Sequence, residues 1–491
     1  NNNKDENIAI TSDNNNVIKY SDLKKFIFDI SGQLASQGIT PSNRAAIVLP
    51  NGPEMATAFL SISSYMSAAP LNPSYKLKEY EFYLQDLMPK IVIVEKDSQN
   101  PAVEAAKNLG IEICEIKKID NAPAGIFNLY DKTANFELAT ENNEALVLHT
   151  SGTTSRPKVV PLTNKNIFSS ATNIANSLQL SSQDHCYNIM PLFHIHGLIA
   201  VLSSSINAGA SVYASSGFNA LKFLETADKE SITWYSGVPT MHQAILMRAK
   251  KNPKLAEELS LRFIRSSSAS LPPAVFDELK KIFKTTVIEA YGMTEATHQM
   301  TSNPMPPEKQ KAGFVGKPAG PEVCIMDAQG NKLDTGVDGE VCIRGDNVTN
   351  GYENNEEANK TAFINGWFRT GDQGHFDDEG YLKISGRLKE IINRGGEKVS
   401  PLEVDNILME HEAVEQVVTF AVKDNLLGEA IGVAIVLKSG IDCNETDIKN
   451  YARKHLADFK IPKYIRFLEE IPKGATGKLQ RIGLAEKLGL E

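Results

Sequence analysis

Residues 146–162 read LVLHTSGTTSRPKVVPL, and the interpretation of the whole chain starts from this stretch. Its apolar beginning, Leu146–Leu148, predicts a short buried strand. The strand leads into a loop with five hydroxyl side chains, one glycine and two cations. Hydroxyls and backbone N–H groups can donate to phosphate, Gly152 lets the backbone come close, and Arg156 and Lys158 balance negative charge. The stretch therefore predicts a phosphate-binding loop, with a Ser/Thr-rich surface turn as the alternative.

The loop differs from a P-loop of the Walker type. Gly152 and Lys158 have the Walker separation. However, Pro157 occupies the position of the second glycine, and Val159 occupies the position of the hydroxyl that would bind magnesium. We therefore expect phosphate binding without ordinary transfer of a γ-phosphoryl group.

Composition limits the class of protein. A chain of 491 residues with 42% hydrophobic and 23% charged residues predicts a globular protein of two or three domains. The net charge of −9 argues against nucleic acid or an acidic membrane surface as the main partner. No apolar run approaches the roughly 20 residues of a membrane span, and the polar start has no signal-peptide core.

The cysteines and the two ends of the chain bear on localisation. Five cysteines are scattered without a CxxC pair, which is typical of reduced thiols in a cytosol-like compartment. We expect a cytoplasmic protein. A peroxisomal location stays an alternative, although the final residues, Leu488–Glu491, are not a Ser-Lys-Leu signal.

Strand and helix patterns alternate through most of the chain, which predicts an α/β fold with two mostly parallel, doubly wound sheets. Ligands in such sheets bind beyond the carboxyl ends of the strands. The expected strands run over 44–49, 91–94, 111–114, 146–148, 187–190, 211–214, 232–236, 263–266 and 287–290. The expected helices run over 22–34, 53–66, 78–87, 101–109, 164–178, 198–206, 220–227, 241–250 and 272–283.

The character of the sequence changes after residue 313. Short β-rich runs at 323–326, 340–343 and 381–384 predict a small β subdomain that ends near Arg387. The last hundred or so residues predict a compact α+β unit, with helices at 401–410 and 445–456 and strands at 414–422 and 430–437. We therefore expect an N-terminal domain over residues 1–387 and a small mobile C-terminal domain over residues 388–491, with a hinge near Lys389.

Three further segments contain candidate functional residues, and each is weak by itself. Residues 289–295, EAYGMTE, follow a predicted strand, and an aromatic ring followed by threonine and glutamate suits a purine, a phosphate and Mg²⁺. The alternative is a helix N-cap. Residues 367–372, WFRTGD, place Asp372 where a carboxylate could accept ribose hydroxyls. Lys478 lies on a glycine-containing loop, and the alternative interpretation is an ordinary solvated lysine.

The order and spacing of these motifs resemble the adenylate-forming superfamily. This superfamily comprises acyl- and aryl-CoA synthetases, beetle luciferase and peptide-synthetase adenylation domains. The motifs are TSGTTSRPK at 150–158, YGMTE at 291–295, RTGD at 369–372, GRLKE at 386–390 and ATGK at 475–478. The resemblance covers residues 17–480. One departure is Val159, because the family loop often continues Lys-Gly.

The resemblance implies an AMP-forming carboxylate–CoA ligase that uses ATP, Mg²⁺ and coenzyme A, and it implies roles for individual residues. The implied catalytic residues are Lys478, Thr294 and Glu295, of which Glu295 would bind Mg²⁺. Lys389 would be the hinge, and Gly395 and Gly396 would enter the site on the side where CoA binds. The implied ATP-binding residues are Thr150, Ser151, Gly152, Thr153, Thr154, Lys158, Ser268, Ala269, Glu289, Tyr291, Thr294, Asp372 and Arg387.

Within the superfamily, the segments PLFHIHGL, YGMTEATHQMTSN and INRGGEKVSP resemble most closely the oxalate–CoA ligases of plants and fungi. Oxalate carries a second carboxylate that must be paired or hydrogen-bonded once it is buried. His194, Ser236, Ser268 and His298 could meet this need. Alternatively, His194 only gates the pocket and His298 only braces a helix. A zinc site at His194-x-His196 is disfavoured, because alternate residues of an extended segment point opposite ways and no cysteine or carboxylate cluster joins these histidines.

The sequence thus predicts ATP-dependent ligation of a small acid to coenzyme A through an acyl-adenylate, with release of AMP and pyrophosphate. Oxalate is the expected acid, which would give the protein a role in oxalate catabolism. The alternatives are a 4-coumarate or medium-chain acyl-CoA ligase, and a nucleotide-binding regulatory protein without turnover. The expected partners are the acid, ATP and CoA, with no nucleic acid and no membrane span, in a monomer or homodimer.

Overall fold

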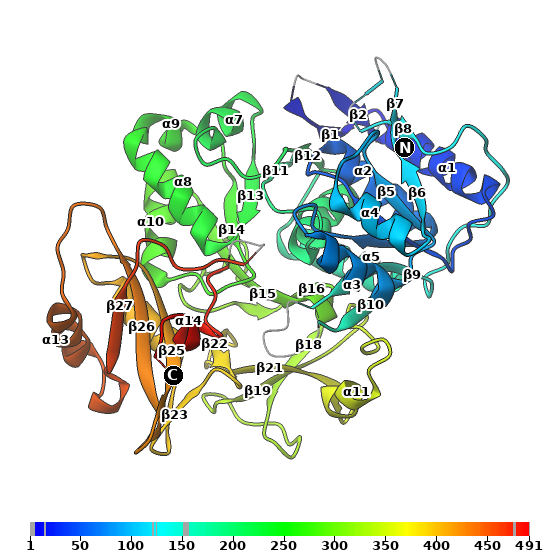
Figure 1. Ribbon diagram of the computed structural model, residues 1–491. Helices are drawn as coiled ribbons and strands as arrows, with labels where there is room; N and C mark the ends of the chain where they lie inside the picture. Colours follow the sequence, from blue (N-terminus) through cyan, green and yellow to red (C-terminus); the bar gives the residue numbers. More distant parts are fainter. Residues whose placement is uncertain are drawn as a thin grey trace.

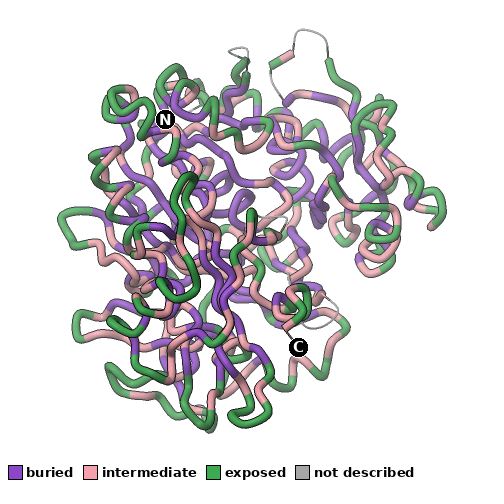
Figure 2. Tube along the Cα trace, turned by 60° about the vertical axis from the view of Figure 1, so that its left-hand side comes forward, coloured by how far each residue is buried: buried purple, intermediate pink, exposed green. Residues whose placement is uncertain are grey.

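The computed structural model describes residues 5–13, 16–119, 122–123, 125–150, 157–474 and 478–490. Figure 1 shows a large N-terminal part, coloured blue to yellow, and a smaller C-terminal part, coloured orange to red. Each part is built around its own sheet or sheets. Figure 2 shows buried segments running through the interior and exposed segments around them. The predicted α/β fold is confirmed.

The larger sheet of the N-terminal part has the strand order β17-β16-β15-β14-β13-β11-β12-β1-β2. Strands β15 to β1 in this order are parallel, and antiparallel strands lie at both edges. The strands are β1 (Ile8–Thr11), β2 (Val17–Lys19), β11 (His185–Asn188), β12 (Ser211–Ala214), β13 (Trp234–Gly237), β14 (Phe263–Ser266), β15 (Thr286–Met293), β16 (His298–Ser302) and β17 (Lys317–Pro318).

The second sheet has the order β10-β9-β4-β3-β5-β6, and every neighbouring pair except β10–β9 is parallel. Its strands are β3 (Arg44–Val48), β4 (Ser67–Pro70), β5 (Ile91–Val94), β6 (Glu112–Glu115), β9 (Glu144–His149) and β10 (Val159–Thr163). The β4 and β5 residues are buried at every position, as expected for parallel strands covered on both faces. A small ladder of β7 (Lys117–Lys118) and β8 (Phe127–Asn128) lies beside it.

Alternate side chains of each strand enter different cores, because successive residues of a strand point to opposite faces. Ile91 and Ile93 join the largest core, whereas Val92 and Val94 pack on the opposite face. The largest core also contains side chains of the other sheet, such as Trp234. The two sheets therefore share one middle layer of helices, which are α1 (Tyr20–Ser36), α2 (Pro53–Tyr65), α5 (Asn164–Ser177) and η2 (His196–Ser203).

The outer faces are covered by two further groups of helices. On the second sheet they are α3 (Leu77–Leu87) and α4 (Pro101–Asn108). On the larger sheet they are α7 (Phe223–Lys229), α8 (Pro239–Lys251), α9 (Pro253–Glu258) and α10 (Pro273–Phe283), which Figure 1 shows grouped beside β13 and β14.

The apolar run near residue 200 is helical, as predicted, but it is not an ordinary α-helix. Residues His196–Ser203 form the π-helix η2, which continues as α6 (Ser204–Ala208). A Cβ on Gly197 would lie 2.4 Å from the Pro191 carbonyl oxygen, so only glycine fits where this helix begins. An apolar composition indicates a buried helix but does not distinguish an α-helix from a π-helix. π-Helical turns are frequent at functional sites.

The remaining sheets follow in chain order. The β subdomain contains β18 (Glu322–Met326), β19 (Gly339–Arg344), β20 (Phe363–Ile364), β21 (Trp367–Phe376) and β22 (Leu382–Arg387), with α11 (Glu356–Ala362) beside them. The C-terminal sheet contains β23 (Ile392–Arg394), β24 (Glu397–Val399), β25 (Val414–Asp424), β26 (Gly428–Leu437) and β27 (Tyr464–Phe467). Its helical elements are α12 (Pro401–Met409), α13 (Glu445–His455), η4 (Asp458–Lys460) and α14 (Leu484–Lys487).

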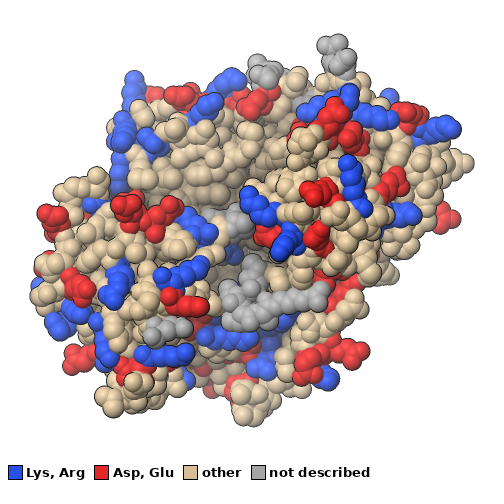
Figure 3. Space-filling view, viewed as in Figure 1, with Lys and Arg blue, Asp and Glu red and all other residues tan. Residues whose placement is uncertain are grey.

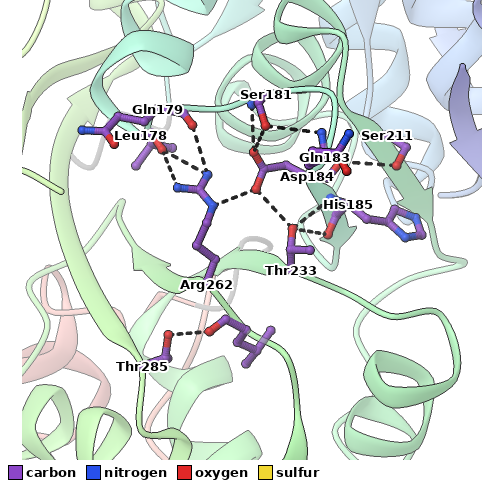
Figure 4. Close-up of polar contacts among 11 residues, drawn as sticks. Leu178, Gln179, Ser181, Gln183, Asp184, His185, Ser211, Thr233, Arg262 and Thr285 are labelled. Atoms are coloured by element: carbon purple, nitrogen blue, oxygen red, sulfur yellow. Dashed lines mark hydrogen bonds and ion pairs between the residues drawn. The ribbon is translucent and has the colours of Figure 1, made fainter. Parts of the chain in front are cut away.

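Arg262 links helix α5 to the larger sheet, as Figure 4 shows. Its Nε donates to Asp184 Oδ1 at 2.8 Å, and its Nη1 and Nη2 donate to the Leu178 carbonyl at 3.2 and 3.1 Å. Leu178 follows the last residue of α5, where the helix dipole is negative and the carbonyls need donors. Asp184 also accepts from Thr233 Oγ1, and its side chain is only 4% exposed. The guanidinium therefore satisfies a helix end and a buried carboxylate together.

No helix among the described residues is both long and apolar enough to cross a membrane.

Replacing Arg262 by methionine is expected to lower the free energy of unfolding by about 2–4 kcal/mol, because a buried carboxylate loses its cation. Trp234 lies in the neighbouring strand β13, so tryptophan fluorescence during urea unfolding measures the loss. The matched control is Lys117→Met, which breaks the exposed pair with Asp131 and should cost less than about 0.5 kcal/mol. Equal urea midpoints for the two variants would contradict the assigned role of Arg262.

Candidate active site

Residues from seven segments converge at the carboxyl end of the larger sheet. They come from the β9–β10 connection, the start of η2, the loops after β13 and β14, the β15–β16 hairpin, the β21–β22 pair, and the C-terminal loop that carries Lys478. Figure 3 shows Lys and Arg side chains around a hollow on this face of the molecule. The site is therefore assembled by both parts of the chain.

The predicted phosphate loop connects two antiparallel strands, β9 and β10. Its two ends are fastened together, because the Thr150 N–H donates to the Lys158 carbonyl at 2.9 Å and the Lys158 N–H donates to Thr150 Oγ1 at 3.2 Å. The predicted phosphate ligands Ser151, Gly152, Thr153 and Thr154 lie outside the described residues. The described part of the loop thus places Lys158 and the Thr150 hydroxyl at its base.

Lys158 and Glu295 meet at the ring of Tyr352. The ammonium of Lys158 lies 4.2 Å from the ring centroid, and the Tyr352 hydroxyl donates to Glu295 Oε1 at 2.8 Å. Burial raises the pKa of the Glu295 carboxyl, and the Tyr352 hydrogen bond opposes this shift. Glu295 belongs to the short 3-10 helix η3 (Thr294–Ala296), so Thr294 is its direct neighbour. Tyr352 was missed in the sequence, where its surroundings give no signal.

A second group joins Tyr291, Asp372 and Arg387. The Tyr291 hydroxyl donates to Asp372 Oδ2, and Arg387 Nε lies 3.2 Å from Asp372 Oδ1. Burial raises the pKa of the Asp372 carboxyl, while the Arg387 charge and the tyrosine hydroxyl pull it down. These residues come from β15, β21 and β22, so the fold brings Tyr291 to two side chains that follow it by more than 80 residues in the sequence.

Lys478 extends from the C-terminal part into this group. Burial lowers the pKa of its ammonium from 10.5 to about 8; the charge of Arg387 lowers it further and that of Asp372 raises it. The Lys478 charge also acts on the rings of His194, His196 and His298. The ammonium thus lies between the Asp372–Arg387 pair and a cluster of histidines.

The histidine cluster lies beside the first turn of η2. His196 Nδ1 is 3.0 Å from Ser268 Oγ, and His196 Nε2 is 2.6 Å from Ser236 Oγ. The His298 ring centroid is 5.0 Å from that of His196. The predicted pocket residues His194, Ser236, Ser268 and His298 therefore gather in one place, with His196 between the two serines. The sequence interpretation placed His194 and His196 on an extended segment, whereas a turn leads directly into η2.

Burial makes the imidazoles neutral. It lowers the pKa of His194 to about 3 and lowers the pKa values of His196 and His298 well below their usual range. His194 Nδ1 accepts from the His196 N–H at 3.3 Å, so its proton is on Nε2. Neither ring nitrogen of His298 has a hydrogen-bond partner among the described residues, although the side chain is almost fully buried. Such orphaned donors and acceptors are costly unless a ligand satisfies them.

Two buried residues behind the histidines were missed in the sequence. Arg265 in β14 donates from Nη1 to Ser236 Oγ at 3.3 Å and from Nη2 to Gln299 Oε1 at 3.1 Å. Gln299 in β16 donates in turn to Ser177 Oγ and to the Ala319 carbonyl. A signal for Arg265 was present, because it is the one charged residue in the strand Phe263–Ser266, which was predicted to be buried.

Other predicted site residues lie at the edges of the cluster. Glu289 points into the protein, where its Oε1 accepts from the Leu271 N–H at 2.8 Å and burial raises the pKa of its carboxyl to about 8. It therefore holds the loop that contains Ser268 and Ala269. Lys389 is exposed in the turn between β22 and β23.

Gly395 and Gly396 form the exposed tip of the β23–β24 hairpin, with φ of +63° and +96°. Positive φ at both central residues is typical of a type I′ turn. Figure 1 shows β23 at the end of the C-terminal sheet away from β15 and β16.

The chain belongs to the AMP-binding enzyme family. The AMP-binding enzyme domain matches residues 1–353, and the C-terminal domain of AMP-binding enzymes matches residues 403–478. The chain is similar to an oxalate–CoA ligase of Arabidopsis thaliana, with 46% identity over 91% of this chain and 89% of that protein. It is also similar to an oxalate–CoA ligase of Saccharomyces cerevisiae, with 43% identity over 90% of this chain and 86% of that protein.

Solved structures share the fold. ATP-bound MatB from Rhodopseudomonas palustris superimposes with a TM-score of 0.89 at 26% identity, covering 99% of this chain and 96% of that one. The o-succinylbenzoate CoA synthetase MenE from Bacillus subtilis, in complex with its acyl-adenylate intermediate, superimposes with a TM-score of 0.84 at 27% identity, covering 98% and 95%.

The ammonium of Lys478 is expected to titrate near pH 8 in the ligand-free protein, because burial disfavours its charged form. Arg387→Met should raise this pKa by removing a like charge, and Asp372→Asn should lower it by removing an opposite one. NMR of ¹³C-dimethylated lysines measures the titration, and the Lys478→Arg variant assigns the signal. A pKa near 10.5 that ignores both substitutions would refute the placement of Lys478 beside this pair.

Proposed function

We propose that the protein is an AMP-forming ligase that joins oxalate to coenzyme A. The observation that carries the proposal is His298, a buried imidazole without a hydrogen-bond partner among the described residues, in electrostatic range of Lys478. Lys478 would contact the reacting carboxylate of oxalate. His298, His194 and Ser268 would contact its second carboxylate. The similarity to two oxalate–CoA ligases supports the same acid.

The first half-reaction joins two anions. A carboxylate oxygen attacks the α-phosphorus of ATP, and the bond from this phosphorus to the oxygen that bridges to the β-phosphate breaks. Pyrophosphate leaves, and the other product is an acyl-adenylate. Positive charge must offset the repulsion as the two groups approach. Lys478 would supply it at the carboxylate and the α-phosphate, with Thr294 beside them. Lys158, Thr150 and their loop would hold the departing phosphates.

The nucleoside side fits the second group of residues. Asp372 would accept the ribose hydroxyls with Arg387 beside it, and the ring of Tyr291 would pack against adenine near Ser268 and Ala269. The hydrogen bond from Tyr291 to Asp372 keeps both side chains in place before the nucleotide arrives.

The carboxylate of Glu295 suits a magnesium ion. A carboxylate has two oxygens and several lone pairs, so the Tyr352 hydrogen bond to Oε1 leaves acceptor capacity. Carboxylate oxygen is the ligand that Mg²⁺ prefers, and the bound ion would neutralise charge on the phosphates. Tyr352 orients the carboxylate, and Lys158 balances its charge across the same ring.

The second half-reaction needs a different arrangement of the C-terminal part. The CoA thiol loses its proton, its sulfur attacks the acyl carbonyl, and AMP leaves as the carbon–oxygen bond of the anhydride breaks. We infer a domain boundary between residues 387 and 388, because β22 and β23 belong to different sheets. Rotation near Lys389 would withdraw Lys478 and bring Gly395 and Gly396 toward the site, so that one lid serves both steps.

The acid specificity is tested by pyrophosphate exchange and CoA-ester formation with oxalate, malonate, octanoate and 4-coumarate. Oxalate should give the highest kcat/KM, because a long acyl chain would leave the buried imidazoles unpaired. Activity with octanoate or 4-coumarate but not with oxalate would instead identify the alternative ligases. Absence of exchange with every acid would identify a protein that binds nucleotide without turnover.

Lys478→Ala separates the two half-reactions. We expect adenylation to fall by about 10²- to 10³-fold, because the charge at the α-phosphate is lost. CoA-ester formation from supplied acyl-adenylate should stay near the rate of the unsubstituted protein. Lys473→Ala, in the same loop with an exposed ion pair to Glu470, is the matched control and should leave both rates unchanged. An equal loss in both half-reactions would show that Lys478 has another role.

A further inference from the structure

Arg265 is a fully buried cation without a counterion. Its side chain is 0% exposed, and it forms no ion pair with any described residue. Its two partners, Ser236 and Gln299, are neutral, and its Nε has no hydrogen-bond partner in the described part of the chain. A buried guanidinium is normally paired, because leaving it unpaired costs much of its hydration energy. Arg262, three residues earlier, follows that rule through Asp184.

The position of Arg265 connects it to the histidine cluster. Arg265 and Ser236 are register partners on the parallel strands β14 and β13, and Ser236 contacts His196. The charge of Arg265 acts on the rings of both His196 and His298. The guanidinium therefore lies one side chain behind the groups proposed to face the acid.

The hydrogen bonds fix the direction of each proton. Arg265 can only donate, so Ser236 Oγ accepts from it. The described contacts of Ser236 leave His196 Nε2 as the acceptor for its own hydroxyl proton. A neutral His196 then carries its proton on Nδ1 and donates to Ser268 Oγ. Ser268 accepts this bond, and its hydroxyl proton is left to donate to a ligand.

Positive charge stands on two sides of this cluster. Lys478 and Arg265 both lower the pKa values of His196 and His298 through their positive charge. The three imidazoles are neutral, so the cluster holds two cations and neutral donors. Lys478 has Asp372 beside it and would meet the reacting carboxylate, whereas Arg265 has no counterion among the described residues. A second carboxylate on the ligand would balance the charge of Arg265, and a monocarboxylate would leave it unbalanced.

We propose that Arg265 is the positioning residue that makes the site select a small dicarboxylate, by supplying charge behind the far carboxylate and by orienting the Ser236–His196–Ser268 donors toward it. The inference rests on the proposed function, because it concerns the second carboxylate of oxalate. It adds a residue that does not touch the acid and that acts through Ser236 and His196.

Oxamate tests the charge, because it matches oxalate in shape and carries an amide where oxalate carries its second carboxylate. The measurements are the KM for oxalate in pyrophosphate exchange, the inhibition constant of oxamate, and the KM for ATP. In the unsubstituted protein oxalate should be preferred on the order of 100-fold, and Arg265→Gln should reduce the preference to about 10-fold or less. Arg265→Lys, which keeps the charge, should retain an intermediate preference. The KM for ATP should change by less than about 3-fold.

Arg262→Met is the matched control, because it removes a neighbouring arginine that is paired elsewhere. It should lower stability without changing the preference for oxalate over oxamate. An unchanged preference in Arg265→Gln would overturn the inference while oxalate exchange in the unsubstituted protein upholds the proposed function. Absence of oxalate exchange in the unsubstituted protein would overturn both.

Ser236→Ala tests the direction of the hydrogen bonds between Arg265, Ser236 and His196. It also tests the inference if Arg265→Gln fails to fold. It interrupts the path from Arg265 to His196 and leaves the charge in place. We expect the KM for oxalate to rise about 10-fold and the ¹⁵N NMR signals of His196 to lose the pure Nδ1–H tautomer. Ser266→Ala, on the adjoining strand, removes a hydroxyl that has no hydrogen-bond partner among the described residues, and it should change neither. An unchanged KM and tautomer in Ser236→Ala would overturn the relay.

Discussion

The burial of positive charge at the junction of the two parts of the chain is the constraint on which the site depends. The reaction brings a carboxylate to a triphosphate, and water would screen any cation that stood in the open. Lys478 is instead held where burial lowers the pKa of its ammonium to about 8, which is close to neutral pH. The carboxylate of Asp372 raises this pKa and so helps to keep the ammonium protonated. The N-terminal part supplies that carboxylate and the C-terminal part supplies the lysine, so the complete site exists only when the two parts meet.

Some buried charges of the described N-terminal part are paired and others are left for a ligand, and this distinction separates structural from functional groups. Arg262 and Asp184 neutralise each other and hold helix α5 against the sheet. Asp372 and Arg387 also pair, but Tyr291 and Lys478 join them at the face where a nucleoside would lie. Arg265 has no acid, and His298 has no hydrogen-bond partner in the described chain. The unpaired groups lie together, which is why they define the acid side of the site.

Much of the fold could be predicted because its determinants are local. The strands at 44–49 and 91–94 are short, largely apolar runs, and their burial on both faces shows directly in the sequence. Two parallel-rich sheets were predicted, but the strand order of each sheet and the helical layer that they share were not, because these depend on strand pairing over long separations. The π-helical form of η2 was also missed, since the same apolar residues suit an α-helix.

The candidate residues divide in the same way. Thr294, Glu295, Asp372 and Lys478 belong to motifs whose order resembles a known family, so the sequence singles them out. His196 was considered only as a zinc ligand, on a segment that was expected to be extended, and a turn into η2 instead directs its ring between Ser236 and Ser268. Tyr352 and Gln299 acquire their importance only from the contacts they make.

The backbone around the acid side is strained in a way that fits its chemistry. Ser268 and His298 both have positive φ, +73° and +94°, which side chains other than glycine rarely adopt. Such conformations cost about 1–3 kcal/mol each and persist only where the surroundings impose them. Gly292 is part of that surrounding, because a Cβ there would lie 1.8 Å from the His298 carbonyl oxygen.

Neighbouring side chains hold the same backbone from the other side. Ser170 Oγ donates to the carbonyl of Thr297, and Thr297 Oγ1 donates to the carbonyl of Asn347. The strained backbone thus lowers stability but orients two particular side chains. These are Ser268 and His298, which both have unused hydrogen-bonding capacity. Strain and orphaned polar groups are independent observations, and both identify this corner of the sheet as the place where a ligand completes the structure.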